Sequence, residues 1–106
     1  MNLRTLDELR AEQAEGRRPY LEFLRSGAMS VGLYVLDVGQ VDRQQPHAED
    51  EIYVVMSGRA RFSAGDETRD AAAGDVIYVA AGVAHRFHDI TARIALIVVF
   101  APSESG

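Results

Sequence analysis

Short apolar segments, separated by turns that contain glycine, follow one another through most of this chain. A turn signal about every 8 to 12 residues is typical of β-sandwiches and β-barrels. The chain is therefore predicted to be an all-β protein from Pro19 onward. The segments predicted as strands are residues 20–24, 31–38, 52–56, 59–62, 67–69, 76–79, 85–90 and 94–100.

Only the first sixteen residues have a helical pattern. Thr5 is suited to the N-cap position, Glu8 completes a capping box three residues later, and Gly16 is a natural stop. We expect a helical N-terminal arm over about residues 1–16 and a barrel over about residues 20–102. With 106 residues, the chain has enough material for a single domain, 1–106.

Composition excludes several classes of function. Without cysteine the chain can form no disulfide, thiolate zinc site or cysteine nucleophile. All eleven basic residues are arginines, so Schiff-base chemistry on lysine is excluded as well. The net charge of −5 argues against a nucleic-acid partner, which would require a clustered positive patch.

The N-terminus does not resemble a targeting signal. Asp7 and Glu8 stand where a leader would be basic and then apolar. The longest apolar run, residues 94–101, is too short for a membrane helix of about 20 residues and is predicted to be a buried strand. We therefore expect a cytoplasmic protein with no membrane partner.

Three histidines and a group of acids are the candidates for chemistry. Residues two apart on a strand point the same way, so one face is expected to carry Gln45, His47, Glu49 and Glu51. By the same rule His85, Phe87 and Asp89 share a face, with Arg86 and His88 opposite. If both segments line one interior, two imidazoles and a carboxylate converge, a ligand set that suits iron and also zinc, manganese or nickel.

Two stretches around these residues resemble the two sequence motifs of the cupin superfamily. Seven of the ten motif letters match, and every internal spacing matches. The first stretch is Gly39-x5-Gln45-x-His47-x3-Glu51-x6-Gly58, against the family pattern Gly-x5-His-x-His-x3-Glu-x6-Gly. The second is Gly74-x5-Ala80-x-Gly82-x2-His85-x3-Asp89, against Gly-x5-Pro-x-Gly-x2-His-x3-Asn.

This resemblance implies a double-stranded β-helix, that is, a jelly-roll barrel, with a metal site inside. The family's usual ligand positions correspond here to Gln45, His47, Glu51 and His85, and only Gln45 departs from the pattern. An amide oxygen is a weaker ligand than an imidazole. Gln45 could ligate through that oxygen or hydrogen-bond a metal-bound water; alternatively, the metal site is lost and the barrel binds only an organic ligand.

The remaining motif positions are given structural interpretations. Asp89 is expected on the His85 face, either orienting a donor there or, as the preferred interpretation, capping a backbone group. Glu49 and Asp50 are expected as acids at the rim of the barrel mouth, since only Glu51 has the motif's spacing to Gly58.

Four aromatic residues are candidates for binding a substrate. Tyr53 follows Glu51 by two positions and Phe87 follows His85 by two, so both are expected to point inward beside the ligands. Tyr34 and Tyr78 are further candidates. The alternative for all four is core packing, which we prefer for Phe87.

The leading functional hypothesis is a metal-dependent enzyme, dioxygenase- or isomerase-like, acting on a small organic molecule inside the barrel. The alternative is a non-catalytic module that binds a metal or a small molecule. A homodimer is expected with either function, because residues 20–24 and 94–100 could form sheet edges that pair between subunits.

Overall fold

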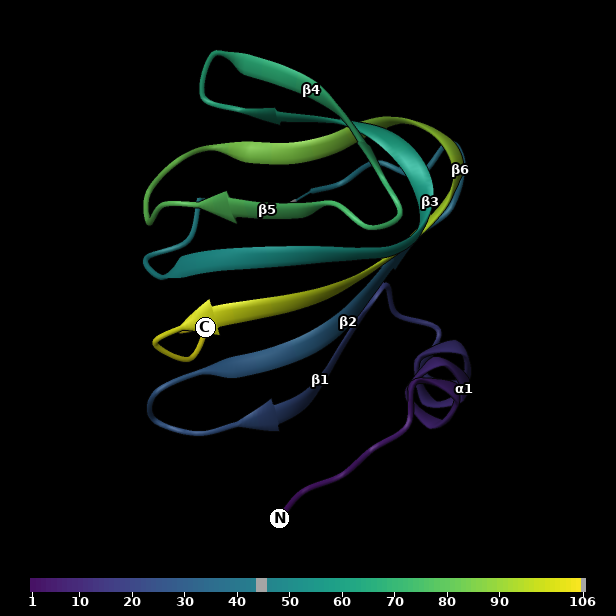
Figure 1. Ribbon diagram of the computed structural model, residues 1–106, viewed down its shortest axis with the longest axis vertical. Coiled ribbons are helices and arrows are strands. Elements are labelled where there is room, and N and C mark those ends of the chain that lie inside the picture. Colours follow the sequence, from purple (N-terminus) through teal and green to yellow (C-terminus); the bar gives the residue numbers. More distant parts are fainter. Residues whose placement is uncertain (44–45, 106) are drawn as a thin grey trace.

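The computed structural model describes residues 1–43 and 46–105. It confirms the predicted all-β architecture with a short N-terminal helix (Figure 1). The elements in chain order are α1 (Leu6–Gly16), β1 (Tyr20–Arg25), β2 (Ser30–Leu36), β3 (Asp50–Ala64), β4 (Glu67–Ala72), β5 (Val76–Val79) and β6 (His85–Ala101).

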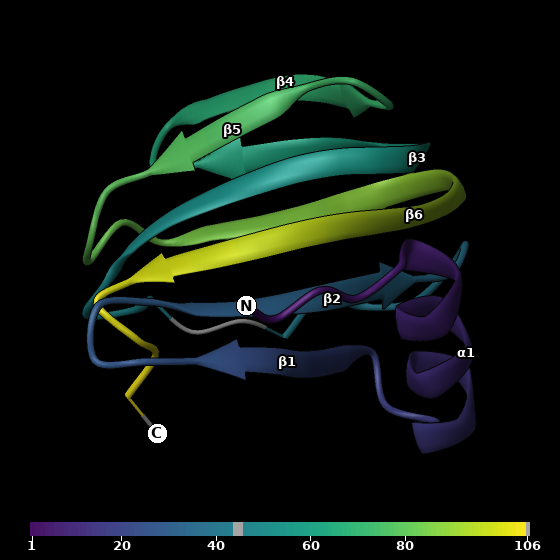
Figure 2. The ribbon, with the colours of Figure 1, turned by 60° about the horizontal axis from the view of Figure 1, so that its bottom comes forward.

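The strands form an antiparallel sheet that folds into two layers. The order is β1-β2-β6-β3-β4, and β5 pairs with β3. Residues 51–54 of β3 pair with β5, whereas residues 59–64 pair with β4. The long strands β3 and β6 lie side by side and run through both layers (Figure 2). One layer contains β1, β2 and β5; the other contains β4.

Two predicted interruptions of strands are wrong. Residues 52–56 and 59–62 belong to the single strand β3, and residues 85–90 and 94–100 to β6. Gly58 has a φ of 93°, and a Cβ there would lie 2.1 Å from the carbonyl oxygen of Arg93. The register of β3 against β6 shifts on both sides of Gly58. The glycine therefore marks a bulge at which the strand bends between layers and does not end.

The main core lies between the layers and is rich in aromatic side chains. Tyr53 and Phe87 are both 0% exposed, and their ring centroids are 5.0 Å apart. Phe62 packs on Phe87 at 4.6 Å. Tyr53 and Phe62 also pack against the ring of His85, with centroids 6.0 Å away in each case, so this aromatic core adjoins the candidate site.

The helix covers a second, smaller core on the outer face of β2 and β6. Leu9 packs there with Leu33 and Ala95. The predicted N-cap is confirmed, since the amide of Glu8 donates to Thr5 Oγ1 at 3.2 Å. The helix ends at Gly16 as expected. In the described part of the chain, no helix is long and apolar enough to cross a membrane.

Candidate metal centre

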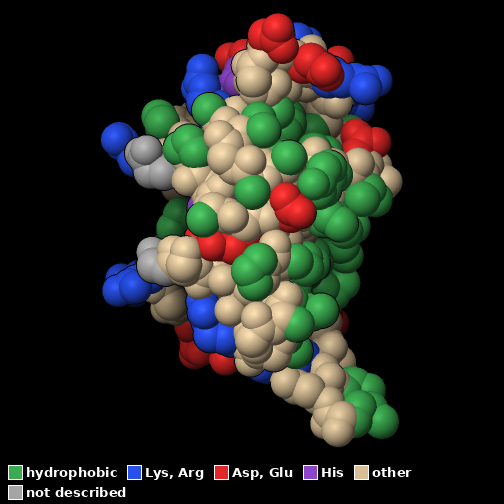
Figure 3. All heavy atoms as spheres, turned by 90° about the vertical axis from the view of Figure 1, so that its left-hand side faces the viewer, with side chains coloured by type: hydrophobic (Ala, Val, Ile, Leu, Met, Phe, Trp, Pro, Cys, Tyr) green, Lys and Arg blue, Asp and Glu red, His purple; other side chains and the backbone are tan. Residues whose placement is uncertain are grey.

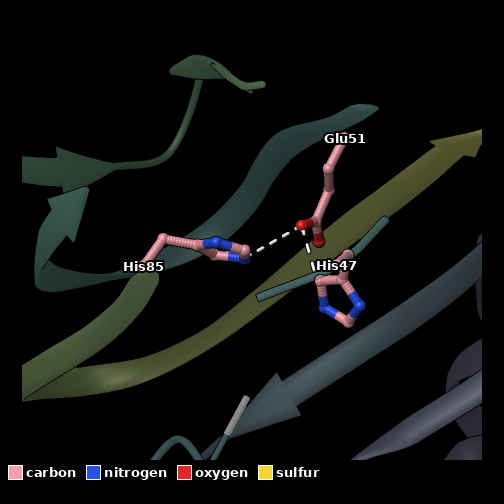
Figure 4. Close-up of side chains that lie close together, drawn as sticks. All are labelled: His47, Glu51 and His85. Atoms are coloured by element: carbon pink, nitrogen blue, oxygen red, sulfur yellow. Dashed lines mark ion pairs between the residues drawn. The ribbon is translucent and has the colours of Figure 1, made fainter. Parts of the chain in front are cut away.

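Three side chains from three parts of the chain meet inside the barrel (Figure 4). Glu51 comes from β3, His85 begins β6, and His47 lies in the segment before β3. One donor atom from each residue lies within 4.8 Å of the other two. His85 Nε2 is 2.9 Å and His47 Nε2 is 4.0 Å from Glu51 Oε1.

The turn before β6 connects the two halves of this site. The amide of Gly82 donates to the carbonyl oxygen of His47 at 2.7 Å. The neighbouring amide, that of Ala81, donates to Asp50 Oδ1 at 2.9 Å. Gly82 has a φ of 81°, which favours glycine. The spacing from Gly82 to His85 therefore fixes both histidines relative to each other.

His85 is oriented by its own turn. Its Nδ1 lies 2.8 Å from the carbonyl oxygen of Val83, to which a ring N–H at Nδ1 donates. Nε2 then faces Glu51 and also Tyr53 Oη, at 3.1 Å. Burial lowers the pKa of His85, but Glu51 and the Val83 carbonyl outweigh it and raise the pKa above its ordinary value of 6.5. Unless protonated, His85 therefore directs a lone pair toward the carboxylate.

Glu51 is the residue whose environment best fits a metal ion. Its side chain is 1% exposed; Oε1 lies 2.9 Å from His85 Nε2, and Oε2 has no hydrogen-bond partner among residues 1–43 and 46–105. A buried carboxylate with an unsatisfied oxygen is costly, and a bound cation would remove that cost. Ligand atoms on one ion lie about 3–4 Å apart, so only small side-chain rotations are needed here. The residues present fit a divalent transition metal.

His47 contacts a residue that the sequence analysis did not identify. Its Nδ1 is 3.4 Å from Glu104 Oε2, in the segment after β6. Burial raises the pKa of the Glu104 carboxyl, and His47 opposes that shift. The ring of His47 also packs on Phe100, with centroids 4.8 Å apart. No sequence motif includes Glu104, because its approach to His47 depends on the path of the chain after β6.

A cavity of about 680 Å³ lies beside the cluster, and His47 is part of its wall. Tyr34 lines this cavity and donates from its hydroxyl to Asp42 Oδ1 at 2.6 Å. The other oxygen of Asp42 accepts from the amide of Phe87 at 2.8 Å. The lining residues are Arg18, Pro19, Tyr20, Tyr34, Leu36, Gln40, Val41, Arg43, His47, Val98, Phe100 and Glu104.

The other candidate residues that the structure describes lie in different environments. Tyr53 and Phe87 point inward next to His85, although neither lines the cavity, and Phe87 packs in the core. Tyr78 is 62% exposed and pairs in register with Ile52 on the outer face, away from the cluster. Gln45 lies outside the described residues.

Environments were predicted for three acids, and two of the predictions, those for Asp89 and Glu49, are wrong. Asp89 does not share the His85 face: its φ is 47°, its side chain is 72% exposed, and Oδ2 lies 2.9 Å from Nδ1 of His88. The left-handed backbone at Asp89 breaks the alternation on which the prediction rested. Glu49 is not a rim acid, since it is 5% exposed and accepts from Ser105. Asp50 is exposed, as expected of a rim residue.

Comparison with known proteins finds a relative of similar length. The chain is 56% identical over 100 residues to the uncharacterized protein SCO3923 of Streptomyces coelicolor, covering 94% of this chain and 95% of that protein.

Two solved structures show the same fold. TT1209 from Thermus thermophilus has a TM-score of 0.79 at 24% identity, covering 97% of this chain and 99% of that one. A Klebsiella pneumoniae protein with a double-stranded β-helix domain has a TM-score of 0.78 at 20% identity, covering 100% and 94%. The model of the Cupin domain family matches residues 32–101, and the chain therefore belongs to the cupin superfamily.

Proposed function

We propose that this protein is a metal-dependent enzyme that acts on a small organic molecule in the cavity beside His47. The observation that carries the proposal is the buried carboxylate of Glu51, which lies between two imidazoles and whose Oε2 has no hydrogen-bond partner in the described chain. A site that served only the fold would not need an unsatisfied carboxylate at this depth.

The roles of the residues follow from their positions. His47, Glu51 and His85 would hold a divalent metal such as iron, zinc, manganese or nickel. The bound metal would supply Lewis-acid or redox chemistry at a substrate oxygen, which suits a dioxygenase- or isomerase-like reaction. Three protein ligands leave positions for substrate. In this proposal Gln45 is either a fourth, amide ligand or a hydrogen-bond partner of metal-bound water.

The cavity wall indicates the class of substrate. Tyr20, Tyr34 and Phe100 supply aromatic surface, and the Tyr20 hydroxyl is buried without a hydrogen-bond partner in the part of the chain that the structure describes. Arg18 and Arg43 also line the cavity, are exposed, and have no ion pair within the described residues. We therefore infer an apolar or aromatic molecule that carries a carboxylate or another anionic group.

Metal content tests the first part of this proposal. Purified protein, and protein reconstituted with iron, nickel, manganese or zinc, should contain about one metal per chain by elemental analysis. His47→Ala should lose it, whereas the matched control His88→Ala should keep it, because His88 contacts Ser63 and Asp89 away from the cluster. Protein that stays free of metal after reconstitution would refute the proposal.

Turnover separates an enzyme from a binding module. The second candidate function is a non-catalytic binding module. One sequence feature favours it, namely the glutamine at position 45 where the family motif has histidine. Small aromatic and aliphatic acids should be incubated with the metal-loaded protein, with and without oxygen, and the products analysed. Saturable binding without a product would establish the module and exclude the enzyme for those compounds.

Residues 94–100 were predicted to form a sheet edge, which is wrong because β6 lies between β2 and β3; β1, with residues 20–24, is at an edge. The outer face of the barrel offers another surface for the proposed homodimer. Ile52, Val76 and Tyr78 are 39%, 67% and 62% exposed and lie together on β3 and β5. Figure 3 shows hydrophobic side chains gathered along one side of the molecule. A second copy of the chain would cover this apolar surface. Sedimentation should give a dimer that Tyr78→Glu dissociates; a monomeric wild-type protein at micromolar concentration would contradict the proposal.

A further inference from the structure

We propose that Glu104 is a positioning residue that holds the His47 ring with Nε2 turned toward the metal site. The inference rests on the proposed metal site and adds to it a residue that lies outside both family motifs. The starting observation is that Glu104 Oε2 lies 3.4 Å from His47 Nδ1, while His47 Nε2 is the nitrogen nearest Glu51.

The segment that carries Glu104 is itself held in place. Figure 2 shows the chain after β6 running past the ends of β2 and β1. The amide of Glu104 donates to Ser30 Oγ at 2.9 Å, and its carbonyl oxygen accepts from Arg25 at 2.8 Å. Ser105 donates to the buried Glu49 at 2.8 Å. Glu104 is therefore anchored on both sides of its Cα.

In both histidines of the site Nδ1 faces an oxygen atom, at 2.8 Å in His85 and at 3.4 Å in His47. In His85 the Nδ1 faces the carbonyl oxygen of Val83, two residues earlier in its own turn. His47 lies outside the strands, and its Nδ1 faces a carboxylate from the far end of the chain. An N–H at Nδ1 that points to an oxygen leaves Nε2 with its lone pair free to bind a metal.

The contact between His47 and Glu104 is partly shielded from solvent. The side chain of His47 is 16% exposed and that of Glu104 is 25% exposed, so water competes only partly for either group. Both residues line the same cavity. The carboxylate thus selects the tautomer and orientation of the ring that present Nε2 as a ligand.

The test compares three variants of the full-length protein. Glu104→Ala removes the acceptor, and Glu104→Gln keeps an acceptor oxygen but removes the charge. Asp89→Asn is the matched control, because Asp89 also pairs with a histidine Nδ1, that of His88, but on the exposed surface. Zinc affinity is measured by competition with a chelator. The tautomer of each histidine is read from ¹⁵N chemical shifts of the metal-free protein, at a pH above the ordinary histidine pKa.

We expect Glu104→Ala to weaken zinc binding about 10- to 100-fold, the range typical for loss of a residue that orients a metal ligand. Glu104→Gln should retain part of the affinity because its amide oxygen can accept from an N–H at Nδ1. Asp89→Asn should bind zinc as the wild type does. In the metal-free protein, His47 should be the Nδ1–H tautomer in the wild type and a mixture in Glu104→Ala.

Other outcomes overturn the inference. Wild-type affinity together with an unchanged His47 tautomer in Glu104→Ala would show that Glu104 has no positioning role. Equal losses in Glu104→Ala and Glu104→Gln, with the tautomer unchanged, would indicate a through-space charge effect. If the wild type binds no metal, the proposed function fails, yet the ¹⁵N shifts still decide whether Glu104 orients His47.

Discussion

Replacing Glu51 by glutamine should leave the metal-free protein nearly as stable as the wild type while removing its stabilisation by metal. Burying a carboxylate costs several kcal/mol. A protonated His85 at 2.9 Å returns about 6 kcal/mol at an effective dielectric constant of about 20. These opposing contributions nearly cancel. Because His85 can release its proton in the variant, no buried charge is left unpaired, and the free energy of unfolding should change by less than about 2 kcal/mol.

With metal added, the wild type should become clearly more stable than Glu51→Gln. A ligand present at 100 times its Kd stabilises a folded protein by about 2.7 kcal/mol, which corresponds to roughly 10 °C in Tm for a domain of this size. Glu51→Gln offers only a neutral amide oxygen, so its Tm should rise by less than about 3 °C.

Calorimetry on chelator-treated protein, with and without added zinc, measures both effects. Asp70→Asn, an exposed acid on β4, controls for the change in net charge. An increase in Tm of wild-type size in Glu51→Gln would refute the assignment of Glu51 as a ligand. A large loss of stability in the metal-free variant would show that the ion pair with His85 outweighs the cost of burial.

Three further predictions concern the fold, proton competition and the cavity wall. Gly58→Ala should cost at least about 3 kcal/mol in urea denaturation, because its Cβ would lie 2.1 Å from a β6 carbonyl, whereas Gly27→Ala, in open space, should cost less than about 1 kcal/mol. Zinc affinity should fall as the pH drops through the pKa of His85, which lies above 6.5, because protons compete with the metal. The metal-free protein should show the opposite pH dependence: the stability that His85 contributes is complete below pH 6.5 and is lost as the pH rises through that pKa. Tyr34→Phe should destabilise the protein by about 1–3 kcal/mol in thermal unfolding, because the hydroxyl that bonds Asp42 is lost, and should leave zinc affinity unchanged.

The sequence was sufficient to predict the fold class and the convergence of His47 and Glu51 with the distant His85. Spacing within the motifs is local information, and it fixes the turn at Gly82, whose amide holds the carbonyl of His47. The end of a strand was harder to predict. Gly58 has the same appearance in a sequence whether it stops a strand or bends one, and only the contact with the β6 backbone distinguishes the two.

The remaining differences between prediction and structure have two causes: contacts between residues far apart in sequence, and strand positions where side chains do not alternate between the two faces. Glu104 is far from His47 in sequence, and its contact depends on anchors from β1 and β2 that no local pattern contains. Asp89 was placed by counting alternate residues, which fails where a backbone adopts a positive φ. The orientation of Tyr78 could not be predicted, because no motif residue on its strand fixes which face is the inner one.

The tyrosines around the site give the protein a built-in optical probe. The chain has four tyrosines and no tryptophan, so its ultraviolet emission comes from tyrosine. Tyr20 and Tyr34 line the cavity, and the Tyr53 hydroxyl lies 3.1 Å from His85 Nε2. Only Tyr78 lies away from the site. Arrival of a paramagnetic metal or an aromatic ligand should therefore quench most of the intrinsic emission, and occupancy could be followed in the unlabelled protein.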